Sequence, residues 1–224
     1  MMLKVALLLL SLCSTGLAKK QLNNCLDDNK YCLGLPRNCI GAQCHFAYSF
    51  ISNGTHLEIE LLGKNIIDRT WLAIAYSTDK YMEDDLVVFC LRDDGREKSG
   101  KSLAGLAYNE KHENKLIGTI DELNEDNDMG FDLKMVDYNL EDQGLYCKFT
   151  HKIDPIVNEF NTTKLHILMS KGVWMKDNLS YHGKTRSDVG SVDVSGVKKR
   201  KSSGSLVNIF PPIAALALAI FIRN

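Results

Sequence analysis

The chain has 224 residues, enough for one ordinary domain or two small ones, and its 27 Lys and Arg side chains nearly balance its 28 Asp and Glu side chains. No stripe of basic residues interleaved with aromatic residues is present, which argues against a nucleic-acid binder. Hydrophobic residues make up 45% of the chain and charged residues 25%, as in globular proteins. A body of about 175 residues should bury roughly 70% of its unfolded surface and fold without a partner.

Residues 1–18 have the pattern of a secretory signal peptide. Lys4 precedes an apolar run from Val5 to Leu12, and the small residues Gly16 and Ala18 fit a cleavage site directly after Ala18. The run is too short to span a bilayer stably, with an uncleaved anchor as the alternative. We therefore expect the mature chain to enter the secretory pathway.

The C-terminus has the pattern of a glycosylphosphatidylinositol (GPI) attachment signal. An apolar tail, residues 206–224, follows a spacer, residues 196–205, that combines small residues with a basic run. The alternative is a single-pass transmembrane helix, but Pro211 and Pro212 would interrupt a barely sufficient span, and the basic run would lie on the extracellular side. Either anchor would hold the protein at the extracellular face of the plasma membrane.

Cysteine usage agrees with secretion. Once Cys13 leaves with the signal peptide, an even number of cysteines remains, which predicts three disulfides in a secreted chain. We expect Cys90 to pair with Cys147, because both end β-like runs, and the four N-terminal cysteines to pair among themselves. The six cysteines are Cys25, Cys32, Cys39, Cys44, Cys90 and Cys147.

Three N-glycosylation sequons predict glycans on surface loops of a secreted protein. They begin at Asn53, Asn161 and Asn178.

Between the two ends the hydrophobic period is 2 rather than 3.6, which predicts an all-β fold. Residues 56–61, for example, alternate apolar and polar side chains like a strand with one wet face. Turn-rich stretches such as 121–128 separate the strands, and no amphipathic helix of ten or more residues interrupts them. The predicted strands are 44–51, 56–61, 71–77, 86–91, 103–108, 115–120, 131–138, 144–151 and 164–170.

We expect these strands to form an antiparallel, immunoglobulin-like β-sandwich of about nine or more strands, because a twisted sheet with one apolar face must cover it with another sheet. Residues 178–205 are rich in Ser, Gly and Lys and predict a loop followed by a stalk.

One formal motif conflicts with this fold. Residues 95–102 match the phosphate-binding pattern G-x-x-x-x-G-K-[ST], which functions between a strand and a helix of a parallel sheet. Residues 103–108 fit the return strand of a hairpin better than a helix, so we interpret the motif as a hairpin connection. No motif of a hydrolase, metalloprotease, EF-hand or dinucleotide-binding enzyme is present, and we expect a binding or electron-transfer protein rather than an enzyme.

The most specific signal lies in two segments. Residues 71–90 are WLAIAYSTDKYMEDDLVVFC, and residues 171–186 contain Lys171-Gly172 and then LSYHGKTR. Together they resemble the DOMON family, whose hallmark is a strand reading aromatic-x-Ala-Ile-Gly-aromatic-Ser, then an Asp, a loop Met, an acidic pair and a second strand. Ala75 stands where that family usually has Gly.

The resemblance is closest to the DOMON domains of animal ferric-chelate-reductase-like and stromal-receptor-like proteins, and it assigns residues 19–195 to one DOMON domain. The transmembrane reductase module that often follows such a domain does not follow it in this sequence, so direct membrane ferric reduction is not implied.

The resemblance implies a sandwich that holds either haem b or a sugar. In cytochrome members one Met and one His at the same end of the sandwich ligate the haem iron, and the matching positions are Met82 and His182. Such a site transfers single electrons, so we expect electron transfer or redox sensing with a redox partner protein or a small-molecule electron donor. His166 is the reserve ligand. The alternatives are that Met82 merely packs against the core and that His182 is merely solvated.

The competing hypothesis is a haem-free module that recognises a sugar or a partner protein through the same loops. Trp174, Tyr181 and Tyr81 are the candidates for stacking on a ring. Asp84 and Asp85 supply too few oxygens for calcium, so we expect them to shape the loop.

Overall fold

The structure of the chain is a computed structural model. It describes residues 30–36, 39, 43–111, 113–125, 130–141, 144–154, 164–183 and 186–194. Several predictions fall outside these residues and stay predictions: the signal peptide (1–18), Cys25, Asn161, the spacer (196–205) and the C-terminal tail (206–224).

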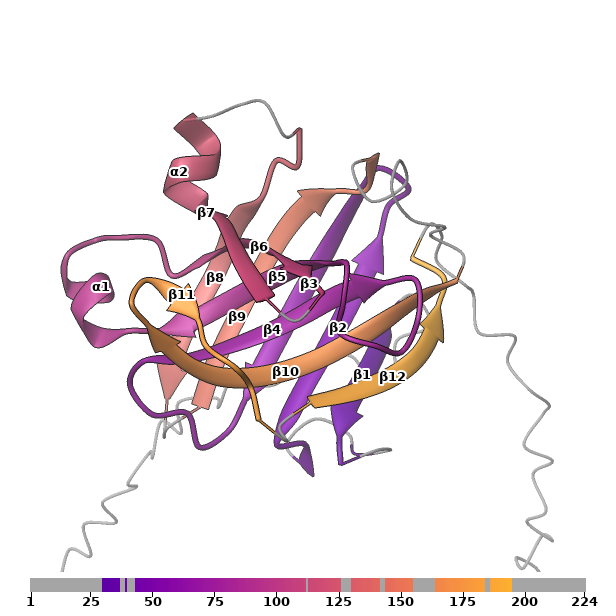
Figure 1. Cartoon of the computed structure of the whole chain (residues 1–224), viewed down its shortest axis with the longest axis horizontal. Helices are drawn as coiled ribbons and strands as arrows, with labels where there is room; N and C mark the ends of the chain where they lie inside the picture. The colour runs from indigo at the N-terminus through magenta and orange to yellow at the C-terminus, as the bar shows by residue number, and fades with distance from the viewer. Residues whose placement is uncertain are drawn as a thin grey trace, which may run out of the picture.

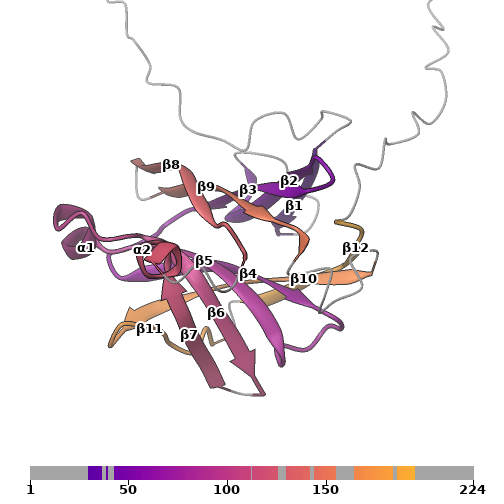
Figure 2. The same cartoon turned by 90° about the horizontal axis from the view of Figure 1, so that it is seen from above.

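Two antiparallel sheets lie face to face (Figures 1 and 2), which confirms the prediction of an all-β, sandwich-like protein. The smaller sheet has the order β1-β2-β3-β9-β8. Its strands are β1 (Tyr31–Leu35), β2 (Phe46–Ser52), β3 (His56–Gly63), β8 (Lys134–Glu141) and β9 (Gly144–Lys152).

The larger sheet has the order β11-β10-β4-β5-β6-β7, and β12 also pairs with β10. Its strands are β4 (Thr70–Ser77), β5 (Asp85–Arg92), β6 (Ala104–Glu110), β7 (Glu113–Thr119), β10 (Leu165–Met175), β11 (Asn178–Leu179) and β12 (Arg186–Val192). The described helices are α1 (Asp94–Lys98) and α2 (Ile120–Glu125). Neither of them has the length and apolarity that crossing a membrane requires.

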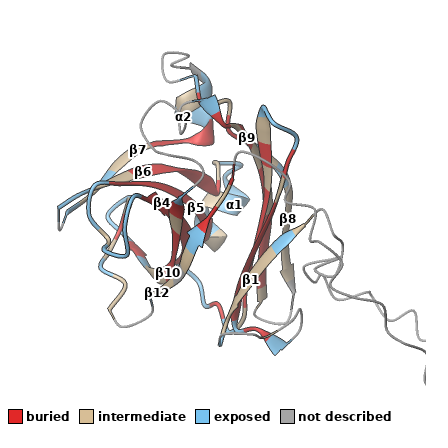
Figure 3. Cartoon of the chain, turned by 90° about the vertical axis from the view of Figure 1, so that its right-hand side faces the viewer, coloured by how far each residue is buried: buried red, intermediate tan, exposed pale blue. Residues whose placement is uncertain are grey.

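Strand alternation builds the core between the sheets. Leu57, Ile59 and Leu61 of β3 are fully buried in it, together with apolar residues of β4, β5 and β9. Figure 3 shows the buried residues on the strands of both layers. The other face of β3 is drier than its polar residues predict: Glu60 is buried, and its carboxylate accepts hydrogen bonds from Ser49 (2.7 Å) and Tyr146 (2.8 Å) and pairs with Lys30.

The larger sheet curls until its two ends meet. β11 and β7 stand at opposite ends of the strand order, yet they lie side by side, and Asn178 Nδ2 donates to the main-chain oxygen of Asn114 (3.3 Å). The curl encloses the outer face of this sheet. A second apolar cluster fills the enclosed space, so strands β4 and β5 are buried on both faces.

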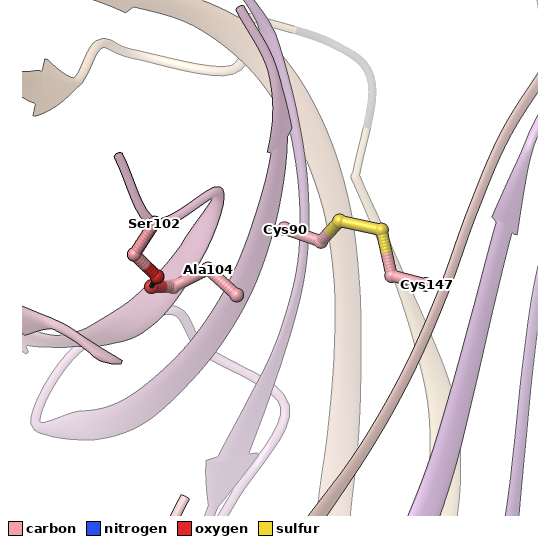
Figure 4. The surroundings of a disulfide bond; sticks show 4 residues. All are labelled: Cys90, Ser102, Ala104 and Cys147. Carbon is pink, nitrogen blue, oxygen red and sulfur yellow. Dashed lines mark hydrogen bonds between the residues drawn. A yellow bond between two sulfur atoms is a disulfide. The ribbon is translucent and has the colours of Figure 1, made fainter. Parts of the chain in front are cut away.

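A disulfide joins the two sheets. Cys90 of β5 and Cys147 of β9 are bonded across the core, with their Cα atoms 6.5 Å apart (Figure 4), which confirms the predicted pair. Cys39 bonds to Cys44, and Cys32 is also disulfide-bonded. The Cys39–Cys44 bond agrees with the prediction that the N-terminal cysteines pair among themselves.

The phosphate-binding interpretation of residues 95–102 is excluded by topology. β5 and β6 pair antiparallel, so the motif lies in a hairpin connection that contains only the five-residue helix α1. Ser102, which would bind magnesium in a phosphate loop, instead donates its hydroxyl to the main-chain oxygen of Ala104 (3.2 Å; Figure 4).

All nine predicted strand segments overlap strands of the structure, but the prediction of a loop and stalk over residues 178–205 is wrong where β11 and β12 lie. β12 follows no local apolar pattern, because it is held by pairing with β10 and buries Val192 at its end. The acidic stretch 121–128 begins inside α2. The sequence signal for α2 is a Thr-x-x-Glu capping box at its start. In this box Glu122 accepts hydrogen bonds from the Thr119 amide (2.7 Å) and hydroxyl (2.9 Å).

Candidate functional site

A pocket lies on the outer face of the larger sheet. It occupies part of the space that the curl of this sheet encloses, and it is open to solvent on one side. Its floor comes from β4, β5 and β10, and its rims come from the loop before β5, the β6–β7 turn and the segment from β11 to β12. The lining residues are Trp71, Ala75, Met82, Val87, Asn109, Lys111, Glu113, Asn114, Ser170, Leu179, Ser180, Tyr181, His182 and Arg186.

Trp71 forms the apolar floor because alternate residues of β4 face the enclosed side. Its indole Nε1 donates to the main-chain oxygen of Val173 (3.1 Å), which fixes the ring. The ring lies across Gly172, its register partner on β10, where an added Cβ would come within 2.6 Å of the indole. A glycine at position 172 is therefore needed for this floor.

Met82 lies in the loop between β4 and β5. The loop is shaped by Ser77, whose hydroxyl accepts from the Asp79 amide (3.1 Å), and by Asp79, whose carboxylate accepts from the Tyr81 amide (2.7 Å). Asp84 ends the loop in the left-handed region at a φ of 58°. The Met82 side chain is half-buried and packs against the cluster on the outer face of the sheet while lining the pocket.

His182 enters the same pocket from the loop after β11. Its Nδ1 lies 3.0 Å from the main-chain oxygen of Gly183, and because a carbonyl only accepts, Nδ1 carries the proton and Nε2 keeps its lone pair. Partial burial lowers the pKa of His182, and the nearby Arg186 guanidinium acts in the same direction, against the opposing effect of the Gly183 hydrogen bond. The imidazole is therefore neutral at physiological pH.

Hydrogen-bonded polar side chains connect one wall of the pocket to the buried Asp85. Asp85 is fully buried, and its carboxylate accepts from Asn109 Nδ2 (3.3 Å), while Asn109 Oδ1 accepts from Asn114 Nδ2 (2.9 Å). Burial raises the pKa of Asp85 to about 7, helped by Asp79 and Asp84 and opposed by hydrogen bonds from Ser77 and Asn109. Each end of this hydrogen-bonded series carries a buried oxygen without a hydrogen-bond partner, Oδ1 of Asp85 and Oδ1 of Asn114.

The structure thus brings Met82 and His182 into one pocket although 100 positions separate them. It does not bring His166 there, because His166 lies on β10 with its Nδ1 3.1 Å from an Asp188 oxygen. Within the described ranges, Asp84 and Asp85 belong to no group of three or more His, Cys, Asp or Glu residues that could hold a metal ion.

The three aromatic residues proposed to stack on a ligand ring differ in their exposure to solvent. Trp174 is 0% exposed and stacks on Phe89 inside the second apolar cluster, so its proposed role in stacking on a ligand is wrong. Tyr181 and Tyr81 are 79% and 57% exposed, and the Tyr181 ring lies 4.8 Å from the His182 ring.

Sequence reasoning missed the polar residues of the wall and mouth. Lys111 lies in the β6–β7 turn, and Asn109 and Asn114 lie in the strand ends beside it, where amide and basic residues are ordinary. Arg186 begins a strand that has no local signal. Only the pairing of β6 with β7 and of β10 with β12 brings them to the pocket.

No known protein-family profile matches the chain. The chain is similar to a Caenorhabditis elegans protein described as "Uncharacterized protein C44B7.5", with 52% identity over 211 residues that cover 92% of this chain and 89% of the nematode protein. The chain therefore belongs to the same family as this nematode protein.

Proposed function

We propose that the chain is a DOMON domain with an immunoglobulin-like sandwich, that its pocket binds haem b through Met82 and His182, and that it transfers or senses single electrons. The observation that carries the proposal is that one pocket is lined by both residues that the DOMON resemblance selects. They reach it from separate loops of the same sheet, after β4 and after β11.

The donor chemistry suits haem iron. A thioether and a neutral imidazole are both iron ligands, and the His182 tautomer presents Nε2, the ring nitrogen opposite the Gly183 contact. The hydrogen bond from Nδ1 to Gly183 orients the ring and raises the basicity of Nε2, as such outer contacts do at metal-ligating histidines.

The shape of the pocket suits a ring that is held at one edge. Its volume is about 190 Å³ and it is partly open to solvent, whereas sites that enclose a whole small molecule measure about 300–1,000 Å³. A porphyrin would therefore keep one edge outside the protein. Trp71, Ala75 and Val87 supply an apolar floor for the inserted part, and they exclude water from it.

Met82 and His182 are the residues that would hold haem iron, and bound haem would supply one-electron chemistry. The residues of this chain then have positioning tasks: the two loops hold the ligands, and the floor keeps the site dry. A partner must deliver and remove electrons, either a redox protein or a small-molecule donor reaching the exposed edge.

The second candidate function is recognition of a sugar or a partner protein without haem. The observation in its favour is the exposure of Tyr181 beside the pocket, together with the amide groups of Asn109 and Asn114 in the wall. Exposed tyrosine rings and amide groups are what a stacked, hydrogen-bonded sugar uses.

The deciding experiment is the visible spectrum of the full chain, secreted from cells supplied with haem. We expect a reducible Soret and α-band spectrum that changes to that of a single strong axial ligand in Met82→Ala and in His182→Ala. The matched controls are Met175→Ala, an exposed methionine at the end of β10, and His166→Ala, and both should keep the wild-type spectrum.

Two results would contradict the haem proposal: a colourless protein after haem supplementation, or a spectrum that neither Met82→Ala nor His182→Ala alters. Binding of the colourless protein to a glycan array would then support the second candidate.

The cell-surface part of the proposal has its own support in sequence. The signal peptide, the sequons at Asn53, Asn161 and Asn178, and the C-terminal tail together favour a GPI-anchored glycoprotein, with a single-pass helix as the alternative. Asn53 is exposed at the β2–β3 turn, while Asn178 lies at the seam of the curled sheet. Release of the protein from intact cells by a phosphatidylinositol-specific phospholipase would distinguish the two anchors.

A further inference from the structure

Two cationic side chains line the pocket without a carboxylate partner. Lys111 and Arg186 form no ion pair with any residue in the described part of the chain, whereas other basic residues, such as Lys134 and Lys148, do. Glu113 is the one acidic side chain in the lining, and it pairs with neither cation. Two cations against one carboxylate in the lining favour negative charge on a ligand.

The two cations come from different walls. Lys111 lies in the β6–β7 turn at a φ of 54°, and Arg186 begins β12, where its register partner is Ser170 of the pocket floor. The Arg186 guanidinium is close enough to His182 to act on its imidazole electrostatically. Lys111 and Arg186 therefore line the same pocket as the apolar floor and as His182, the candidate iron-ligating residue.

This combination defines the chemistry of the occupant. The floor of Trp71, Ala75 and Val87 favours a flat apolar body, and two unpaired cations favour negative charge on the ligand. Lysine and arginine bind carboxylates through charge-assisted hydrogen bonds, and the arginine fork can hold one in two parallel bonds.

We propose that Lys111 and Arg186 bind the carboxylates of the ligand, and that the pocket selects flat apolar molecules that carry a pair of carboxylates along one edge. This inference rests on the proposed function in that haem b is such a molecule, with two propionates on one edge. It does not require iron, because the carboxylate contacts form with the metal-free porphyrin as well.

The test compares metal-free protoporphyrin IX with its dimethyl ester, using the fluorescence of each porphyrin to titrate the full, secreted protein. We expect the acid to bind with a Kd roughly tenfold or more below that of the ester, since a contact to a charged group is worth at least this factor. Lys111→Gln and Arg186→Gln should each weaken binding of the acid by roughly tenfold and leave binding of the ester unchanged. Added salt should weaken binding of the acid alone.

Lys98→Gln is the matched control, because Lys98 is exposed in α1 outside the pocket and its loss should change neither Kd. Equal affinity for acid and ester, no change in either pocket variant, or no binding of the acid by the wild-type protein would overturn the inference.

The metal-free porphyrin separates this inference from the haem proposal, because its carboxylates need Lys111 and Arg186 but its ring has no iron to be ligated. Selective, Lys111- and Arg186-dependent binding of the acid without a Met/His haem spectrum would keep the carboxylate site and remove the haem proposal. A Met/His haem spectrum, together with porphyrin binding that neither Lys111→Gln nor Arg186→Gln weakens, would keep the haem proposal and remove the carboxylate site.

Discussion

At the residue scale, Asp85 is the residue whose environment departs furthest from what its type favours. A carboxylate at the start of a strand would normally reach solvent, but Asp85 is fully buried, and one of its oxygens has no hydrogen-bond partner. Ser77 and Asn109 compensate only in part, so the folded protein favours the protonated acid below neutral pH. An acid of this kind makes the stability of the fold depend on pH.

We expect Asp85→Asn to remove that dependence. The folded-state pKa of Asp85, about 7, exceeds the unfolded value of about 3.9, so the contribution of Asp85 to stability is greatest below pH 4, falls as the pH rises to 7 and stays low above it. Relative to wild type, the unfolding free energy of the variant should rise by on the order of 4 kcal/mol as the pH increases from 4 to 8.

Urea unfolding at pH 4, 6 and 8 measures this gain. Asp154→Asn is the control, because Asp154 is exposed and is not among the groups that shift the pKa of Asp85. If Asp85→Asn and wild type lose or gain stability in parallel over this range, Asp85 is ionised in the folded protein at low pH and the account of its burial is wrong.

At the element scale, the two described disulfides constrain the chain very differently. Cys90–Cys147 joins β5 of one sheet to β9 of the other across 57 positions, whereas Cys39–Cys44 closes a segment of only 5 positions. A cross-link stabilises mainly by limiting the unfolded chain, and the effect grows with the length of the loop it closes.

Removing the inter-sheet disulfide should therefore cost more. We expect Cys90→Ala with Cys147→Ala to lower the unfolding free energy by about 4 kcal/mol, and Cys39→Ala with Cys44→Ala to lower it by about 2 kcal/mol. Urea unfolding of the two double variants measures both losses. Equal losses, or a larger loss for the short loop, would show that the bond between the sheets does not limit the unfolded chain.

The elements themselves were largely readable from the sequence. Alternation over residues 56–61 placed β3, because side-chain orientation in a strand follows directly from chain position. Similar short runs placed eight other strands. β12 could not be found in this way, since its pairing with β10 holds it rather than an apolar face. α2 was missed because its capping box lies within an acidic stretch that favours a turn.

At the scale of the whole molecule, His151 ties the packing of the two sheets to pH. It is fully buried in β9, where Tyr76 of the other sheet lies 2.9 Å from its Nε2 and the Phe131 ring stacks on it at 4.5 Å. Burial lowers the pKa of His151 to about 4, against the opposing effect of its hydrogen bond to the Lys152 main chain. The folded protein therefore requires the neutral imidazole.

His151 and Asp85 should act in opposite directions. The unfolded His151 binds a proton below a pH of about 6.5 and the folded one only below about 4, so its contribution to stability falls as the pH drops through that window. Asp85 gains over the same window. We expect His151→Gln to lose less stability than wild type from pH 6.5 to pH 4, and the double variant with Asp85→Asn to resemble the pH dependence of the wild type.

The same urea titrations test this, with His45→Gln as the control at an exposed histidine. A His151→Gln variant that follows the wild-type pH dependence would show that His151 is not a buried neutral group in the folded protein.

Local chemistry in the sequence determined an all-β chain, the positions of nine strands and the Cys90–Cys147 pair, and the DOMON resemblance selected Met82 and His182 as the residues worth testing. Only the tertiary structure decided the rest. The curl that joins Asn178 to Asn114, the burial of Asp85 and Trp174, and the presence of Lys111 and Arg186 in one pocket all depend on contacts between distant segments. Periodicity reports which way a side chain points from its own strand, but it carries no information about which other strand will cover it.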